Sequence, residues 1–258
     1  MAMHDEIKEQ QKKLKGKTFR EKLGYFWDYY KVHTLVAVAV LIVGGGLIHD
    51  IATAKEEAFS ATLLNAYGGD MQHEFQDAFA EYAGIDTEIY DCYIDTSSTL
   101  NYNMTSEADL AIFQRTVAMA QTGGLDVLAG DLMPFTHMAG TGMFLDLREV
   151  LTGEEYARYE PYFYYLDGAL LEDSDEDASY ESDGSMDFLD TGIDHTDPSS
   201  MENPIPVGIY LPDNQKLKEY SCYALSGETP VLGFVYSTTR LDTAKLFLSY
   251  LMGEPNTP

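Results

Sequence analysis

Among the residues that could do chemistry, the acidic ones have the most recognisable spacing in this chain. Asp173, Asp175 and Asp177 match the first three ligand positions of a calcium-binding loop, where carboxylate oxygens hold Ca²⁺. Ala178 then stands where a glycine should turn the chain, and Gly184 stands where a bidentate glutamate should close the site. The pattern favours a solvated acidic loop over residues 171–198, with weak surface Ca²⁺ binding as the alternative. We predict no metal centre.

Signatures of catalysis are missing from the sequence. Beyond residue 53 the only histidines are His73, His137 and His195, and none has zinc-ligand spacing or stands beside a nucleophile motif. The glycine pairs at 68–69 and 123–124 are turn chemistry and are too short to be phosphate loops. We therefore expect a protein that is not an enzyme and that uses no cofactor.

Alternating apolar runs and helical patterns indicate the fold that positions any binding residues. Residues 59–67, 87–94 and 125–130 are predicted strands, and residues 71–84 and 106–123 are predicted amphipathic helices. Ser106 with Asp109 resembles a capping box. The order strand, helix, strand, helix, strand predicts an α/β domain with a mainly parallel sheet and flanking helices.

Candidate ligand-binding residues follow from this topology, because ligands of open α/β sheets bind beyond the carboxyl ends of the strands. Each candidate also has a structural alternative: Asp70 could cap its helix, and the hydroxyls near residue 238 could cap the last helix. The candidates, in chain order, are Tyr67, Asp70, Asp95, Ser98, Asp131, Phe135, Ser237 and Thr238.

Three segments resemble a known family. They are GGLDVLAGDLMPFTHMAGTGMFLDLREVL at 123–151, PVGIYLPDNQKL at 206–217 and PVLGFVYSTTRLDTAKLFLSYLMG at 230–253. In content and order they resemble bacterial extracellular solute-binding proteins of the periplasmic-binding-protein-like type. The resemblance implies an exported α/β lobe that binds a sugar, an amino acid or a peptide without chemistry.

The chain departs from that family in size. Only residues 152–203 lie between the first three predicted strands and the returning segment, so we expect one lobe with a reduced flap in place of a second lobe. The flap would hold an aromatic cluster that could stack on a sugar ring or pack beneath the flap. Its members are Tyr156, Tyr159, Tyr162, Phe163, Tyr164 and Tyr165.

An apolar run at 34–48 divides the chain and predicts a membrane anchor over residues 34–52. The head, residues 1–33, carries eight of the sixteen Lys and Arg residues against five acids, and it includes an aromatic cluster at 25–30. Basic flanks stay in the cytoplasm and aromatic rings favour the headgroup level. We expect a single-pass anchor with a cytoplasmic N-terminus; a signal peptide cleaved at the A-x-A sequence of 52–54 is the alternative. Both place the body, residues 53–258, outside the cell.

The body carries eight basic residues against 37 acidic ones, a net charge of about −29. That charge argues against nucleic acid or an anionic membrane face as a partner. Cys92 and Cys222 both fall in the body, where a disulfide is permitted.

Together these features predict a membrane-tethered extracytoplasmic domain that binds a small solute or a membrane-protein partner. The alternative is a structural or regulatory subunit of a membrane complex that has lost ligand binding.

Overall fold

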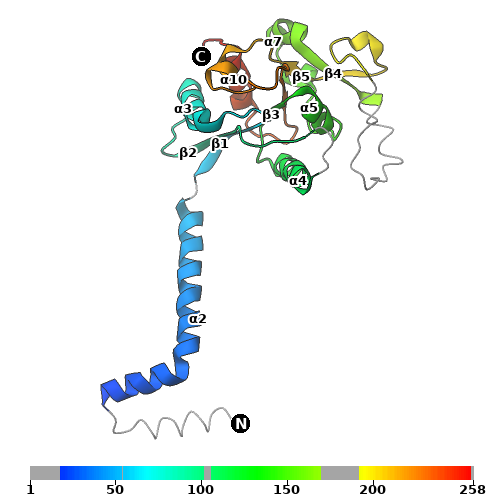
Figure 1. Cartoon of the computed structure of the whole chain (residues 1–258). Helices are drawn as coiled ribbons and strands as arrows, with labels where there is room; N and C mark the ends of the chain where they lie inside the picture. The colour runs from blue at the N-terminus through cyan, green and yellow to red at the C-terminus, as the bar shows by residue number, and fades with distance from the viewer. Residues whose placement is uncertain (1–17, 54, 102–105, 170–191, 257–258) are drawn as a thin grey trace. The chain divides into compact units, whose positions relative to one another are not determined.

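The computed structural model describes residues 18–53, 55–101, 106–169 and 192–256. The chain divides into two compact units, residues 1–54 and residues 55–258 (Figure 1). The predicted calcium ligands Asp173, Asp175 and Asp177, and the first part of the predicted head, lie outside the described residues.

The described residues of the N-terminal unit, 18–53, form the long helix α2 (Phe19–Thr53), which includes the predicted anchor 34–52. Among its described side chains, large apolar groups such as Leu41 and Ile42 are exposed. Three glycines, 44–46, lie within the helix, and a Cβ added at any of them would meet nothing within 4 Å. Among the residues that the structure describes, no helix meets the length and apolarity required to cross a membrane.

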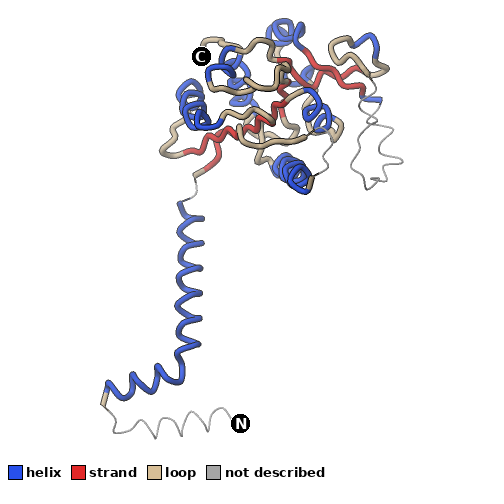
Figure 2. The backbone as a smooth tube through the Cα atoms, in the orientation of Figure 1, coloured by secondary structure: helices blue, strands red, loops and turns tan. Residues whose placement is uncertain are grey.

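The C-terminal unit is built on a six-stranded sheet with strand order β2-β1-β3-β6-β5-β4 (Figure 2). Its strands are β1 (Glu56–Leu64), β2 (Tyr90–Asp95), β3 (Val127–Gly130), β4 (Phe163–Asp167), β5 (Pro204–Tyr210) and β6 (Val231–Phe234). β1 pairs in parallel with β2 and β3, whereas the β3–β6, β6–β5 and β5–β4 pairs are antiparallel. The α/β class is confirmed, but the expectation of a mainly parallel sheet is wrong because β6 returns antiparallel beside β3.

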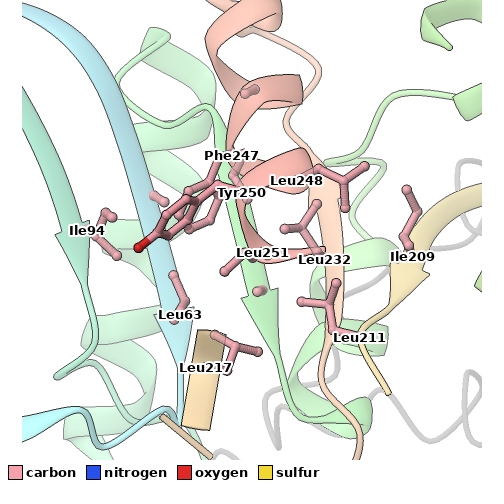
Figure 3. Close-up of a cluster of buried hydrophobic side chains, with 14 of the residues drawn as sticks. Leu63, Ile94, Ile209, Leu211, Leu217, Leu232, Phe247, Leu248, Tyr250 and Leu251 are labelled. Carbon is pink, nitrogen blue, oxygen red and sulfur yellow. The ribbon is translucent and has the colours of Figure 1, made fainter. Parts of the chain in front are cut away.

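Helices cover both faces of the sheet. The helices are α3 (Gln72–Ala83), α4 (Glu107–Thr122), α5 (Leu132–Ala139), α6 (Leu147–Val150), α7 (Gly153–Tyr159), α9 (Gln215–Glu219) and α10 (Leu241–Leu251). Side chains of α3, α6, α7, α9 and α10 share one apolar cluster with one face of β1 and β3. Side chains of α4 and α5 share a second cluster with the opposite face. Figure 3 shows Phe247, Leu248 and Leu251 of α10 in the first cluster with Leu63 and Ile94.

Local sequence signals set the helix ends as predicted. Ser106 and Asp109 form a complete capping box at the start of α4. Gly84 ends α3 and Gly123 ends α4, both in the left-handed conformation that glycine adopts without a Cβ clash.

Part of the predicted flap belongs to the main sheet, since residues 163–167 form β4 at its edge. Tyr159, Phe163 and Tyr164 of the aromatic cluster are buried core residues. The Asp167 carboxylate accepts hydrogen bonds from the backbone N–H groups of Glu202 and Asn203, both at 2.9 Å. These bonds join the described residues on either side of segment 170–191.

A buried ion pair connects the strands at the amino edge of β3. Asp126 is fully buried, and its carboxylate lies 2.9 Å from Arg240 Nε at the start of α10. It also accepts hydrogen bonds from Ser60 N–H at 2.8 Å and from the Thr238 hydroxyl at 2.5 Å. Arg240 in turn donates to Glu57 and to the Gly123 carbonyl. One carboxylate thereby ties together β1, β3, the end of β6 and α10.

Replacing Arg240 by Met should therefore lower the free energy of unfolding by about 3–5 kcal/mol, because it leaves the Asp126 charge buried without its partner. Urea unfolding followed by circular dichroism measures this. The matched control is Arg148→Met, which removes a half-exposed pair with Asp146 and should cost less than about 1 kcal/mol. Equal losses for the two variants would contradict the role of the buried pair.

Candidate functional site

The chain has a topological switch point between β1 and β3. After β1 it continues into α3 on one face of the sheet, and after β3 it continues into α5 on the other face. The loops beyond these two neighbouring strands therefore diverge. This is the position where open α/β sheets bind ligands.

A third segment reaches this edge because β6 is antiparallel to β3. Gly130 pairs with Val231, so the residues before β6 lie beside those after β3. The Tyr223 N–H donates to the Ala66 carbonyl, beyond the end of β1, at 2.8 Å. The edge thus combines residues after β1, residues after β3 and the loop at 220–230.

Asp131 is the central side chain of this edge. It occupies the N-cap position of α5 but makes no capping hydrogen bond. Its Oδ1 atom is buried and has no hydrogen-bond partner among the described residues. A buried carboxylate oxygen without a donor is costly, and a donor from water or from a ligand would offset that cost.

The electrostatics of Asp131 reflect this burial. Burial raises the pKa of the carboxyl, and the nearby charge of Glu228 raises the pKa further. The Asn65 amide and the Ser226 hydroxyl act to lower the pKa but do not reverse the shift. Asp131 and Glu228 belong to none of the ion pairs between described residues. Asp131 and Glu228 therefore lie near each other without a basic counterpart among the described residues.

Tyr223 provides a second polar group without a partner. Its side chain is only 8 % exposed, and its buried hydroxyl has no hydrogen-bond partner among the described residues. Burial is the largest cause that raises its pKa, followed by the charge of Asp131. The backbone of Tyr223 has a positive φ of 58°. Asn65 and Tyr67 lie on either side of Ala66, whose carbonyl accepts from the Tyr223 N–H, and they also have positive φ, of 61° and 54°. Positive φ is strained for tyrosine, and such strain clusters at functional sites.

The structure brings five of the eight predicted residues to this edge of the sheet, but not all remain available for a ligand. Tyr67 and Asp70 are exposed after β1. Asp95 and Ser98 bond to each other after β2, with 2.6 Å between Ser98 Oγ and Asp95 Oδ2. Asp131 is the one with a buried, unpaired oxygen.

The Asp95 carboxylate is fully used within its own loop. It accepts hydrogen bonds from Ser97 N–H, the Ser97 hydroxyl and the Ser98 hydroxyl. Burial acts to raise its pKa, but these hydrogen bonds, with the charge of Arg115, outweigh burial and the net shift is downward. Asp95 and Ser98 therefore shape the turn after β2.

The remaining three predicted residues have structural positions. Phe135 is fully buried and stacks on Phe144 with 4.5 Å between ring centroids. Ser237 and Thr238 follow β6, which runs antiparallel, and so they lie at the opposite edge of the sheet. There the Thr238 hydroxyl donates to Asp126 and the Ser237 hydroxyl donates to the Ala120 carbonyl.

Sequence reasoning did not single out Asn65, Tyr223, Ser226 or Glu228. The last three lie before β6, and they reach the site only because that strand is antiparallel. The sequence around Gly227, whose φ is 67°, predicts a loop but does not indicate where in the fold that loop lies.

Metal and thiol chemistry find little support at this edge. Among the described residues, no group of three or more His, Cys, Asp or Glu side chains could hold a metal ion. Cys92 and Cys222 are free thiols, and burial raises the pKa of each to about 12, so neither is an activated nucleophile.

None of the protein-family models, curated proteins or solved structures compared with this chain matches it. Asp131, Glu228 and the Tyr223 hydroxyl are the polar groups that lie near one another at the switch point.

The two aspartates at this edge should respond to neutralisation in opposite directions. Asp131→Asn removes a half-buried charge that lies near Glu228 and has no basic partner among the described residues, and it should raise the free energy of unfolding at pH 7 by about 1 kcal/mol. Asp95→Asn removes an acceptor of three hydrogen bonds and should lower it by about 1–3 kcal/mol. Urea unfolding of both variants measures the difference.

The pH dependence provides a second measurement. The lowered pKa of Asp95 stabilises the fold above the unfolded-state value of about 3.9, and that stability is lost as pH falls through the folded-state pKa. The raised pKa of Asp131 has the opposite sign, so its cost grows as pH rises through its folded-state value. The gain from Asp131→Asn should therefore shrink on acidification, and a gain that persisted unchanged at pH 3 would contradict this account.

Proposed function

We propose that the protein is a membrane-tethered extracytoplasmic domain that binds a small solute or a protein partner and performs no catalysis. The observation that carries the proposal is the buried Oδ1 atom of Asp131 at the switch point of the sheet, which has no hydrogen-bond partner among the described residues. Such a group raises the energy of the free protein and favours a state in which a ligand satisfies it. The resemblance of segments 123–151, 206–217 and 230–253 to extracellular solute-binding proteins supports the same role.

The tether rests on the apolar run in α2 and on the charges that flank it. Exposed apolar side chains along one helix need a cover, and lipid is a suitable one. Basic residues concentrate before the run, which favours a cytoplasmic head and an external body. The strong negative charge of the body suits a soluble external domain.

A second candidate is a structural or regulatory subunit that has lost ligand binding. It is favoured by the use of Asp95, Ser98 and Phe135 within the fold, since these predicted ligand residues are already engaged. In this case the body would serve as a docking module for a membrane complex.

Cysteine labelling should report the orientation. Ser199→Cys, at an exposed position of the body, should react with a membrane-impermeant maleimide on intact cells, and Thr18→Cys in the head should react only after lysis. The wild-type chain is the control, because its two thiols have pKa values of about 12 and react slowly. Labelling of Thr18→Cys on intact cells would exclude the proposed orientation.

Ligand binding should raise the melting temperature of the full chain in lipid nanodiscs. A ligand at 100 times its dissociation constant adds about 2.7 kcal/mol to stability, which corresponds to roughly 5–10 °C for a domain of this size. A panel of sugars, amino acids, peptides and Ca²⁺ tests this by differential scanning fluorimetry. If no compound shifts the transition, the subunit alternative is favoured over the binding role.

A further inference from the structure

The charge of the Asp131 site restricts the class of ligand. The site places Asp131 near Glu228, and no described basic side chain pairs with either carboxylate. An anionic ligand would add a third negative charge beside two that already repel each other. A neutral ligand would leave both charges uncompensated. A cation compensates them.

The hydrogen-bonding capacity of the site restricts the cation. The unpaired Asp131 oxygen is an acceptor, and the buried hydroxyl of Tyr223, a residue that is only 8 % exposed, is also unpaired and can accept as well. The Glu228 carboxylate adds a third acceptor. An ammonium group has three N–H donors and no acceptor, so it can donate to all three of these oxygens.

Two other cations fit less well. Ca²⁺ takes six to eight oxygen ligands at short distance, and in the part of the chain that the structure describes no group of three or more acidic, histidine or cysteine side chains could hold a metal ion. A guanidinium group is planar and prefers a bidentate carboxylate. Asp131 presents a single unpaired oxygen, Oδ1, as its buried acceptor.

We propose that this site binds the ammonium group of a small organic amine, with Asp131 as the charge partner and Tyr223 and Glu228 as further acceptors. The inference rests on the proposed binding function and specifies its ligand class. The strained turn at Asn65 and Tyr67, held to Tyr223 through the Ala66 carbonyl, keeps the tyrosine at the edge of the sheet where the ammonium would lie.

The experiment uses the full chain in nanodiscs of zwitterionic lipid, so that amines do not accumulate on the bilayer. Ethanolamine and 1,4-diaminobutane are the probes, and ethylene glycol and 1,4-butanediol are their neutral counterparts. Isothermal titration calorimetry should show binding of at least one amine and of neither diol. Asp131→Asn, which should fold at least as well as the wild type, should weaken that binding by about tenfold or more.

Two further variants separate the site from general attraction to an acidic body. Tyr223→Phe keeps the buried ring but removes the hydroxyl, and should weaken amine binding several-fold. Glu81→Gln removes an exposed carboxylate on α3 and should leave the affinity unchanged. Amine binding that is the same in wild type and Asp131→Asn would overturn the proposal, as would the absence of amine binding.

The outcomes distinguish this inference from the proposed function. If a sugar or a peptide binds while both amines fail, the ammonium site is wrong and the binding domain stands. If no compound of any class binds, both fail together, and the labelling experiment still tests the tether independently.

Discussion

The fold depends on one buried carboxylate, Asp126, at the amino edge of the sheet. Its contacts with Ser60 N–H, the Thr238 hydroxyl and Arg240 join β1, β3, the end of β6 and α10, which are far apart in the sequence. A charge without access to water requires all of these partners, so it constrains how the four elements meet. This network lies at the amino edge of β3. The opposite edge is formed by the turn after β1, the start of α5 and the loop before β6, where Asp131 and Tyr223 have polar atoms without partners among the described residues.

The direction of β6 explains most of the difference between the expected and the observed site. A parallel β6 would have delivered Ser237 and Thr238 to the carboxyl edge, as the α/β pattern predicted. The antiparallel strand sends them to the Asp126 network and brings Tyr223 and Glu228 to Asp131 instead. Compared with the predicted arrangement, the antiparallel direction of β6 therefore places a tyrosine and a carboxylate, in place of two hydroxyls, at the carboxyl edge of β3. This edge is more acidic as a result.

Asp95 and Asp131 illustrate how position decides the role of an identical side chain. Asp95 ends β2 and Asp131 follows β3 at the same edge, and burial acts to raise the pKa of both. The serine hydroxyls beside Asp95 overcome that effect, whereas the neighbours of Asp131 do not, and Glu228 adds to it. Asp95 completes the turn after β2, whereas Asp131 has an oxygen without a hydrogen-bond donor, which a ligand can supply.

The sequence by itself determined the features that depend on neighbours along the chain. Strand and helix periodicity, the capping box at Ser106 and the glycine helix ends were predicted, because each arises from contacts within a few residues. Only the tertiary structure decided strand direction, the placement of β4 in the sheet, and the meeting of Asp131 with Tyr223. These depend on which distant segments pack together, and no local pattern records the contacts between them.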